Sequence, residues 1–148
     1  MNNISAFAGP EQSPGFLLWQ VSTQWRRQIE TSLGTLGLTH PQFVLLVSLG
    51  WLTRDQVVVS QVELARHCRM DITMTSQILR ALEQKGYVER RQHAGNERSK
   101  FPHVTERGKE LIGQAIPLVE SVDLAFFEKL GPKTETFAQI LQRLAQED

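Results

Sequence analysis

The sequence predicts a mainly α-helical protein with one small β-hairpin, arranged as a central lobe between N- and C-terminal helices that pair two copies. Apolar residues recur at intervals of three and four along most of the chain, which is the spacing of amphipathic helices. Two such helices, over residues 60–68 and 72–85, are separated by a short turn, and a basic hairpin follows over residues 87–104. A length of 148 residues with 41% hydrophobic side chains is enough for one domain with a buried core.

The N-terminal part of the chain contains an arm and one helix. Residues 1–14 are rich in Asn, Ser, Gly and Pro, which predicts a flexible arm. Between Phe16 and Leu33 the apolar residues have helical spacing, and Gly34 and Gly37 end this helix.

A capping pattern predicts where the second helix begins. Thr39 offers an N-cap oxygen, and Gln42 three residues later completes a capping box. The helix that follows is mostly apolar and ends near Trp51. The β-branched run over residues 57–59 then predicts a brief strand before Ser60.

Capping residues also define the central helix pair. Ser60 and Glu63 form a second capping box, while Asp71 caps the second helix of the pair and Gly86 ends it. The side chains expected to face the core are Val62, Leu64 and Ala65 in the first helix and Met74, Ile78, Leu79 and Leu82 in the second.

Two further helices are predicted after the hairpin. Thr105 begins a long helix whose apolar stripe runs to Phe126, and Pro117 inside it predicts a kink or an interruption. Gly131 and Pro132 precede a last helix. Its apolar face comprises Phe137, Ile140, Leu141 and Leu144.

The terminal helices are apolar over more of their circumference than a small monomer needs. Their stripes could pack only against the central lobe, but we expect the helices of two copies to interlock into a homodimer. One domain is therefore predicted over residues 15–148. Its dimerisation helices lie over residues 15–38 and 105–148, and its central lobe over residues 39–104.

The charge of the chain is balanced overall but unevenly distributed. Lys+Arg and Asp+Glu both number 16, yet residues 66–109 hold ten basic and five acidic side chains. A basic segment between neutral and acidic ones is typical of a nucleic-acid footprint on one face, although it also suits an ordinary solvated surface.

The outer face of the second helix of the pair carries short hydroxyl side chains, then an amide, then a guanidinium. Such a face can enter a major groove about 12 Å wide, where Gln77 can pair with adenine and Arg80 with guanine. Any amphipathic helix has a polar outer face, but the basic hairpin directly after this one favours DNA. We predict contacts with double-stranded DNA for Ser60, Thr73, Thr75, Ser76, Gln77 and Arg80, and in the hairpin for Arg90, Arg91, Arg98 and Lys100.

The hairpin has a tip suited to reach a neighbouring groove. Gly95 and Asn96 tolerate the left-handed backbone of a tight turn. Arg98 follows directly, and a narrow minor groove attracts arginine through its negative potential. Pro102 lacks an N–H, which predicts an edge strand or a bulge at its position.

Three stretches resemble the MarR family of transcriptional regulators, and the resemblance extends over residues 16–145. The stretch Leu38-Thr-His-Pro-Gln-Phe-Val-Leu-Leu46 is similar to the start of that family's second helix. Residues 71–90 are similar to its recognition helix and wing entry, including Leu-Glu-Gln-Lys-Gly-Tyr-Val-Glu-Arg90. Asn96-Glu-Arg98, followed by Val104-Thr-Glu-Arg-Gly108, resembles its wing signature.

This resemblance implies a homodimeric winged helix-turn-helix protein that binds pseudopalindromic operators. Most members repress transcription, and many release DNA when a small, often aromatic or phenolic, effector binds between the two lobes. Carried over by position, Thr73, Ser76, Gln77 and Arg80 would contact the major groove and Arg98 the minor groove. In two places the sequence departs from the family: Asn96 replaces an aspartate that orients the arginine, and Phe101-Pro102-His103 is an unusual strand ending.

Two other functions are consistent with the same sequence. Cys68, beside Arg66, His67 and Arg69, could make a redox-responsive regulator if these side chains lower its pKa. A winged helix could also serve as a protein–protein interaction module, which salt-dependent duplex binding would separate from a DNA reader. The aromatic residues Trp19, Trp25 and Trp51 could line a ligand pocket or belong to the core, so no ligand residue is assigned.

Several classes are not expected. The sequence has no phosphate-binding glycine loop and no nucleophile motif, so neither an enzyme nor a cofactor is predicted. Its histidines and single cysteine lack the close spacing of a metal site, which leaves only a zinc site from distant ligands as an alternative. Without a signal peptide or an apolar run of about 20 residues, we expect a cytoplasmic protein with no membrane partner.

Overall fold

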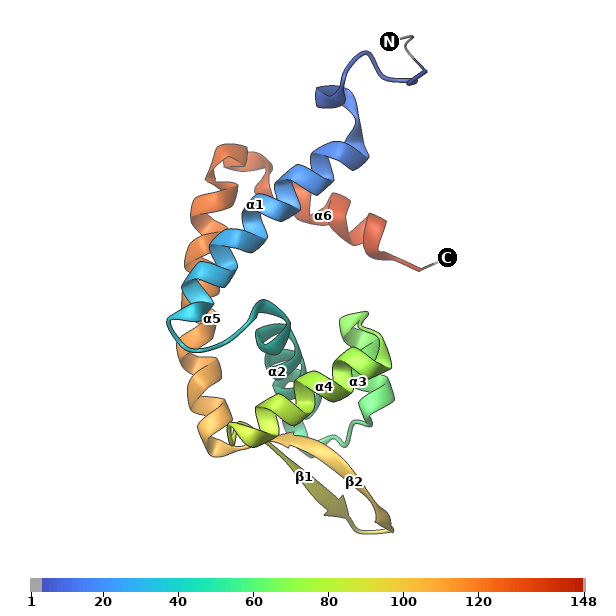
Figure 1. The fold of residues 1–148 in the computed structure, drawn as a ribbon, viewed down its shortest axis with the longest axis vertical. Helices are drawn as coiled ribbons and strands as arrows, with labels where there is room; N and C mark the ends of the chain where they lie inside the picture. The colour runs from blue at the N-terminus through green and yellow to red at the C-terminus, as the bar shows by residue number, and fades with distance from the viewer. Residues whose placement is uncertain (1–3, 148) are drawn as a thin grey trace.

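The computed structural model describes residues 4–147, with the side chains of Asn96 and Glu97 left outside the description. Within this part the chain is mainly helical, with one antiparallel hairpin (Figure 1). The α-helices are α1 (Pro14–Gly34), α2 (His40–Leu52), α3 (Gln61–Cys68), α4 (Ile72–Gln84), α5 (Glu106–Phe127) and α6 (Thr134–Ala145), and the strands are β1 (Val88–His93) and β2 (Asn96–Val104). Short 3-10 turns lie at Pro10–Gln12, Arg54–Gln56 and Glu128–Lys133. The predicted fold class, mainly α with a small β-wing, is confirmed.

The helices near the two ends of the chain, α1, α5 and α6, form one part of the molecule. The helices α1 and α5 pack against each other, and α6 projects from the far end of α5 (Figure 1). The second half of α1 is anchored by the buried Ile29 and Leu33, and Trp25 Nε1 donates a 2.7 Å hydrogen bond to Asp123 on α5. The first half of α1 carries large apolar side chains in solvent, such as Trp19 with 69% of its surface exposed.

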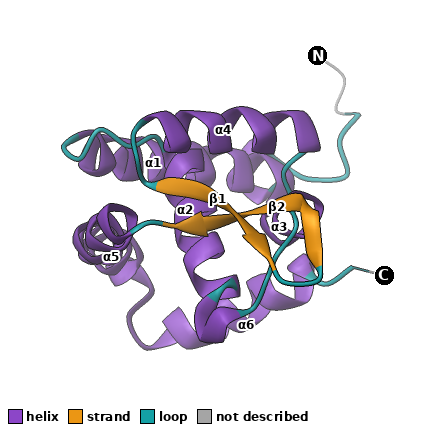
Figure 2. Cartoon of the chain, turned by 90° about the horizontal axis from the view of Figure 1, so that it is seen from below, coloured by secondary structure: helices purple, strands orange, loops and turns teal. Residues whose placement is uncertain are grey.

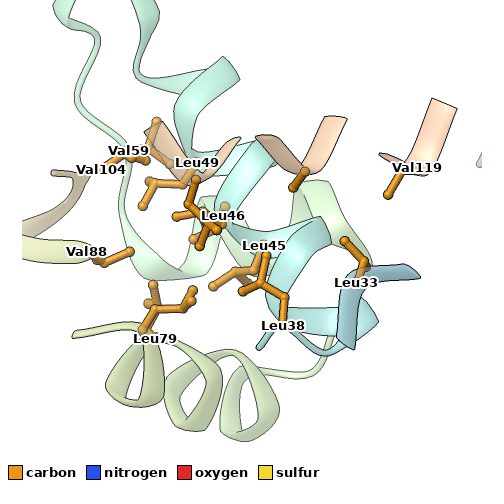
Figure 3. Packing of buried hydrophobic residues seen from close by; sticks show 14 of the residues in the cluster. Leu33, Leu38, Leu45, Leu46, Leu49, Val59, Leu79, Val88, Val104 and Val119 are labelled. Atoms are coloured by element: carbon orange, nitrogen blue, oxygen red, sulfur yellow. The ribbon is translucent and has the colours of Figure 1, made fainter. Parts of the chain in front are cut away.

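The helices α2, α3 and α4 and the hairpin form a compact lobe, which packs against α1 and α5 through α2 and β2. Its core is a set of leucines and valines in which α2 contributes Leu45, Leu46 and Leu49 at the centre (Figure 3). Leu79 from α4 and Val88 and Val104 from the hairpin pack around them. Burial of each such side chain stabilises the fold by about 1.5–3 kcal/mol, so the core fixes α4 and the hairpin relative to α2.

Capping contacts place the helix starts where the sequence predicts them. Thr39 and Gln42 form the complete, reciprocal capping box. Ser60 accepts from the Glu63 N–H at 3.1 Å, and Asp71 accepts from the Met74 N–H at 2.7 Å. In this second box the Glu63 N–H donates to the Ser60 side chain. Among the described residues, the return hydrogen bond from the Ser60 N–H to the Glu63 side chain is not formed.

Other expectations about the elements are corrected. Residues 57–59 form no strand in the described structure. They follow Asp55 and Gln56, which have positive φ, and only Val59 is buried, so the run has neither a partner strand nor an apolar face to cover. The helix α5 is not interrupted at Pro117. Val62 and Met74, expected in the core, are exposed.

Candidate nucleic-acid interface

The outward face of α4 carries the polar side chains predicted to contact DNA. Its N-cap, Asp71, holds the first turn, and Leu79 and Leu82 are fully buried on the inner side. On the opposite side Thr73, Gln77 and Arg80 are exposed and Ser76 is half-buried. A helix presented in this way can offer its first-turn N–H groups to phosphate and its side chains to base edges.

The prediction of a DNA contact is wrong for Thr75. This residue is completely buried, and its hydroxyl donates a 2.8 Å hydrogen bond to the Asp71 carbonyl. Thr75 lies a quarter of a helical turn from Ser76, which places it on the inner side with Leu79. Its role is therefore to stabilise the first turn of α4.

Ser60 occupies the start of α3 and is half-buried. Its oxygen accepts from the Glu63 N–H, which leaves the hydroxyl proton chemically able to be donated to a phosphate oxygen. The predicted contact at Ser60 is thus compatible with its capping role.

The wing, β1 and β2, has two different faces. Arg90 lies opposite Pro102, Arg91 opposite Phe101, and Gln92 opposite Lys100. Since side chains alternate along a strand, Arg98 and Lys100 share the face of Arg90, and Arg91 lies on the other face. Gly95, with φ of 89°, makes the turn at the tip. Figure 2 shows the strands crossing the underside of the lobe beside α4.

The neighbouring arginines Arg90 and Arg91 both have partners within the chain. The Nε of Arg90 donates to Glu83 at 2.7 Å, and its Nη2 donates to Gln61 at 3.1 Å. Arg91 pairs with Glu89 of its own strand at 2.5 Å. The basic character of Arg90 and Arg91 predicts DNA contacts like those of Arg98, but charge alone does not reveal the partners that each of them has within the chain.

The strand ending Phe101-Pro102-His103 is compatible with a regular wing. Pro102 is buried and lies in register opposite Arg90, and the ring of Phe101 packs edge-on against His93 with centroids 5.6 Å apart. The irregularity in the hairpin lies instead between Gln92 and His93. The edge position expected for Pro102 is confirmed, because each strand of a two-stranded sheet is an edge.

A hollow beside the wing was not predicted from the sequence. It has a volume of about 770 Å³ and lies between the end of α2, the start of α5 and the Arg91 face of the wing. The Arg54 guanidinium stacks 3.5 Å above the Trp51 ring at its rim. Its apolar wall includes Val47, Trp51, Val104, Ile112 and Ile116, and its basic side chains are Arg54, Arg91, His93, His103 and Lys109.

Two histidines meet in the wall of this hollow. The Nε2 atoms of His93 and His103 are 2.7 Å apart, so one of these nitrogens must lack a proton for a hydrogen bond to form. Burial lowers the pKa of His103, Arg91 and His93 lower it further, and Glu89 opposes them. These surroundings therefore favour the neutral form of His103.

The histidine pair predicts that the protein loses stability in mild acid. The pKa of His103 is below its unfolded value of 6.5, so its contribution is complete above pH 6.5 and is lost as the pH falls below that value. Urea unfolding at pH 7.5 and 5.5 measures this loss, which His103→Asn should reduce and the exposed His67→Asn should leave unchanged. Equal acid sensitivity of wild type and His103→Asn would contradict it.

Cys68 does not have the environment of a redox sensor. Burial raises the pKa of its thiol, and a hydrogen bond with the Ser48 side chain only partly offsets this effect. The lowered pKa on which the redox alternative depends is therefore not found at Cys68. A raised pKa reduces the thiolate fraction on which oxidation depends.

The part of the chain that the structure describes holds neither a metal-binding cluster nor a membrane-spanning helix. Among residues 4–147, no cluster of three or more His, Cys, Asp or Glu side chains has an arrangement that could hold a metal ion. In the same part of the chain, none of the helices combines the length and the apolar character needed to cross a bilayer.

Comparisons with known proteins agree with this architecture. The model of the MarR family matches residues 38–100. The HTH-type transcriptional regulator YdcH of Bacillus subtilis is 40% identical over 144 residues, 97% of this chain and 97% of YdcH. The MarR family protein Rv2887 of Mycobacterium tuberculosis in complex with DNA matches with a TM-score of 0.71 and 30% identity, over 90% of this chain and 98% of that chain. Rv2887 in complex with p-aminosalicylic acid matches with the same score and identity, over 90% and 99%.

These matches extend beyond the helix-turn-helix. The relatives align along α1, the central lobe and α5 together, so the shared feature is the whole two-lobed arrangement and not a DNA-binding motif alone. The chain therefore belongs to the MarR family of DNA-binding transcriptional regulators.

Proposed function

We propose that the chain is a repressor that binds a pseudopalindromic operator as a homodimer in the cytoplasm. Each protomer places α4 in a major groove, where Thr73, Ser76, Gln77 and Arg80 make contacts, and reaches the adjacent minor groove with Arg98. The observation that carries this proposal is the exposed polar face of α4 beside a wing whose Arg98 and Lys100 are also exposed. Rv2887, which is named a transcriptional repressor, is 31% identical over 90% of this chain. This similarity supports repression instead of activation.

Exposed apolar side chains support the homodimer. On α1, Leu18 and Trp19 are exposed, and on α6, Ile140 and Leu144 are exposed. A monomer would leave this surface in water, whereas a second copy would bury it. We therefore assign residues 15–38 and 105–148 to dimerisation and residues 39–104 to the DNA-binding lobe.

Selection of bound duplexes from a random pool tests the proposal. We expect a two-fold symmetric sequence whose affinity falls steeply with salt, because each displaced phosphate counterion contributes to the slope. A protein–protein interaction module would enrich no sequence.

Substitutions on α4 and on the wing should have different signatures on the selected operator. Gln77→Ala should cost about 1–3 kcal/mol at particular base pairs, because an amide reads a base edge. Arg98→Ala should weaken binding to all sequences, because the minor groove attracts arginine mainly by its potential. Affinities on a panel of single-base operator variants measure both effects. An equal loss from Gln77→Ala on every variant would remove this residue from base recognition.

We also propose that the hollow beside the wing binds a small aromatic effector that releases DNA. Its Trp51 wall can stack on an aromatic ring, and Arg54 and Lys109 can pair with an anion. The complex of Rv2887 with p-aminosalicylic acid supports this ligand class.

If the hollow binds the proposed effector, we expect p-aminosalicylic acid to weaken operator binding. Arg54→Gln should raise the concentration needed for release about tenfold, which is the effect of losing one charge-assisted hydrogen bond. Arg27→Gln, at a separate hollow between α1 and α5, is the matched control. Release that is unchanged in Arg54→Gln and impaired in Arg27→Gln would move the effector to the other site.

A further inference from the structure

Arg90 lies where three elements of the DNA-binding lobe meet. It belongs to β1, and its guanidinium contacts Glu83 near the end of α4 at 2.7 Å and Gln61 at the start of α3 at 3.1 Å. About 30% of the Arg90 side chain and 31% of the Glu83 side chain are exposed, so water screens this pair less than a surface ion pair. A planar guanidinium with two fixed partners restrains both the distance and the angle between the elements.

The position of Arg90 along the wing determines which side chains it can orient. Arg90 lies in register opposite Pro102, before the tip of the hairpin. The exposed Arg98 and Lys100 lie on the same face of the wing, nearer its tip. Any rotation of the wing at Arg90 would therefore move these two side chains relative to α4.

Arg91 provides the contrast within the same strand. It is exposed and, among the described residues, forms its ion pair with Glu89, two residues away on the same face of β1. This ion pair connects no second element, so its loss leaves the orientation of the wing unchanged. Arg90 and Arg91 carry the same charge, but Arg90 contacts two other elements and Arg91 pairs within its own strand.

We propose that Arg90 is a positioning residue that holds the wing at the angle at which Arg98 reaches the DNA while α4 occupies the major groove. This inference rests on the proposed use of α4 and the wing in operator binding. In this role Arg90 acts through Arg98, and Glu83 is an essential partner.

The role of Glu83 separates positioning from direct contact. If Arg90 held a phosphate itself, Glu83→Gln would free its charge and strengthen operator binding. If Arg90 positions the wing, Glu83→Gln removes its anchor and weakens binding, although it also removes a negative charge from the DNA-facing lobe. The two roles therefore predict opposite signs.

A double-mutant cycle on the full-length protein tests the inference. We expect Arg98→Ala to weaken operator binding roughly 5- to 100-fold in the wild type and less than about twofold in Arg90→Gln, because coupled residues are not additive. Glu83→Gln should reproduce this coupling, and Arg91→Gln should leave the effect of Arg98→Ala intact. Gln77→Ala should keep its base-specific loss in every background, which a general loss of folding would not allow.

Each contrary outcome has a separate meaning. An additive cycle between Arg90 and Arg98, or tighter binding by Glu83→Gln, would overturn the positioning role and leave the proposed operator binding intact. No effect of Arg98→Ala in the wild type would overturn the proposed wing contact, and the positioning role with it. Urea unfolding of each variant confirms that the compared proteins are folded.

Discussion

Replacement of Trp19 and Ile140 by glutamate should separate the protein into protomers and weaken operator binding about 100- to 10,000-fold, which is the gain that two linked sites give over one. Trp19 lies on α1 with 69% of its surface exposed, and Ile140 lies on α6 with 50% exposed. Because both are exposed in the protomer, the substitutions should act on the contact between copies and leave the protomer fold intact. Light scattering should give the mass of one chain, 16.8 kDa, instead of twice that value.

Val57→Glu is the matched control for this experiment. Val57 is also apolar and 52% exposed, but it lies before α3 in the central lobe and outside the terminal helices. We expect this variant to remain dimeric. Dimers of unchanged mass from Trp19→Glu/Ile140→Glu would show that α1 and α6 do not join the copies.

The second large effect is expected at Gly108, in the first turn of α5. A Cβ at this position would overlap the carbonyl oxygen of Tyr87 and would lie 2.6 Å from Val104 Cγ1. The same turn is fixed by Thr105, whose hydroxyl donates to the Gly86 carbonyl at 2.6 Å and accepts from the Gly108 N–H at 3.0 Å. The helix therefore cannot move away from the wing entry without breaking these hydrogen bonds.

Gly108→Ala should lower the free energy of unfolding by about 2–4 kcal/mol, as expected for overpacking against backbone. Gly113→Ala on the same helix is the control, because a Cβ there would meet no atom within 4 Å. It should stabilise the protein by about 0.5–1 kcal/mol through the helix propensity of alanine. Urea unfolding measures both values. Equal stability of the two variants would contradict the close approach at Gly108.

Local signals in the sequence were sufficient for most of the fold. Asp71 predicts the start of α4 because an N-cap needs only its own side chain and the next turn. Gly86 ends the helix because its φ of 83° is a conformation that other residues avoid. Such features depend on a few neighbouring residues, so the sequence contains them in full.

Features that depend on distant partners could not be predicted in this way. Residues 57–59 have strand propensity but no partner strand, and propensity describes a fit to a sheet that must already exist. The polar hydroxyl of Thr75 suggests a DNA contact, although the helical position of this residue places it inside. The roles of Arg90 and Arg91 depend on which face of β1 each occupies, and this depends on the packing of Val88 and Val104.

A combined hydroxyl-radical and methylation footprint on the selected operator is the most direct test of how the proposed dimer contacts DNA. Two recognition helices of one dimer should protect two major-groove segments about one DNA turn, ~34 Å, apart. Minor-groove protection should lie beside each segment and should disappear in Arg98→Ala. Protection of a single segment, or minor-groove protection that persists without Arg98, would contradict a dimer that reads the major groove with α4 and the minor groove with its wing.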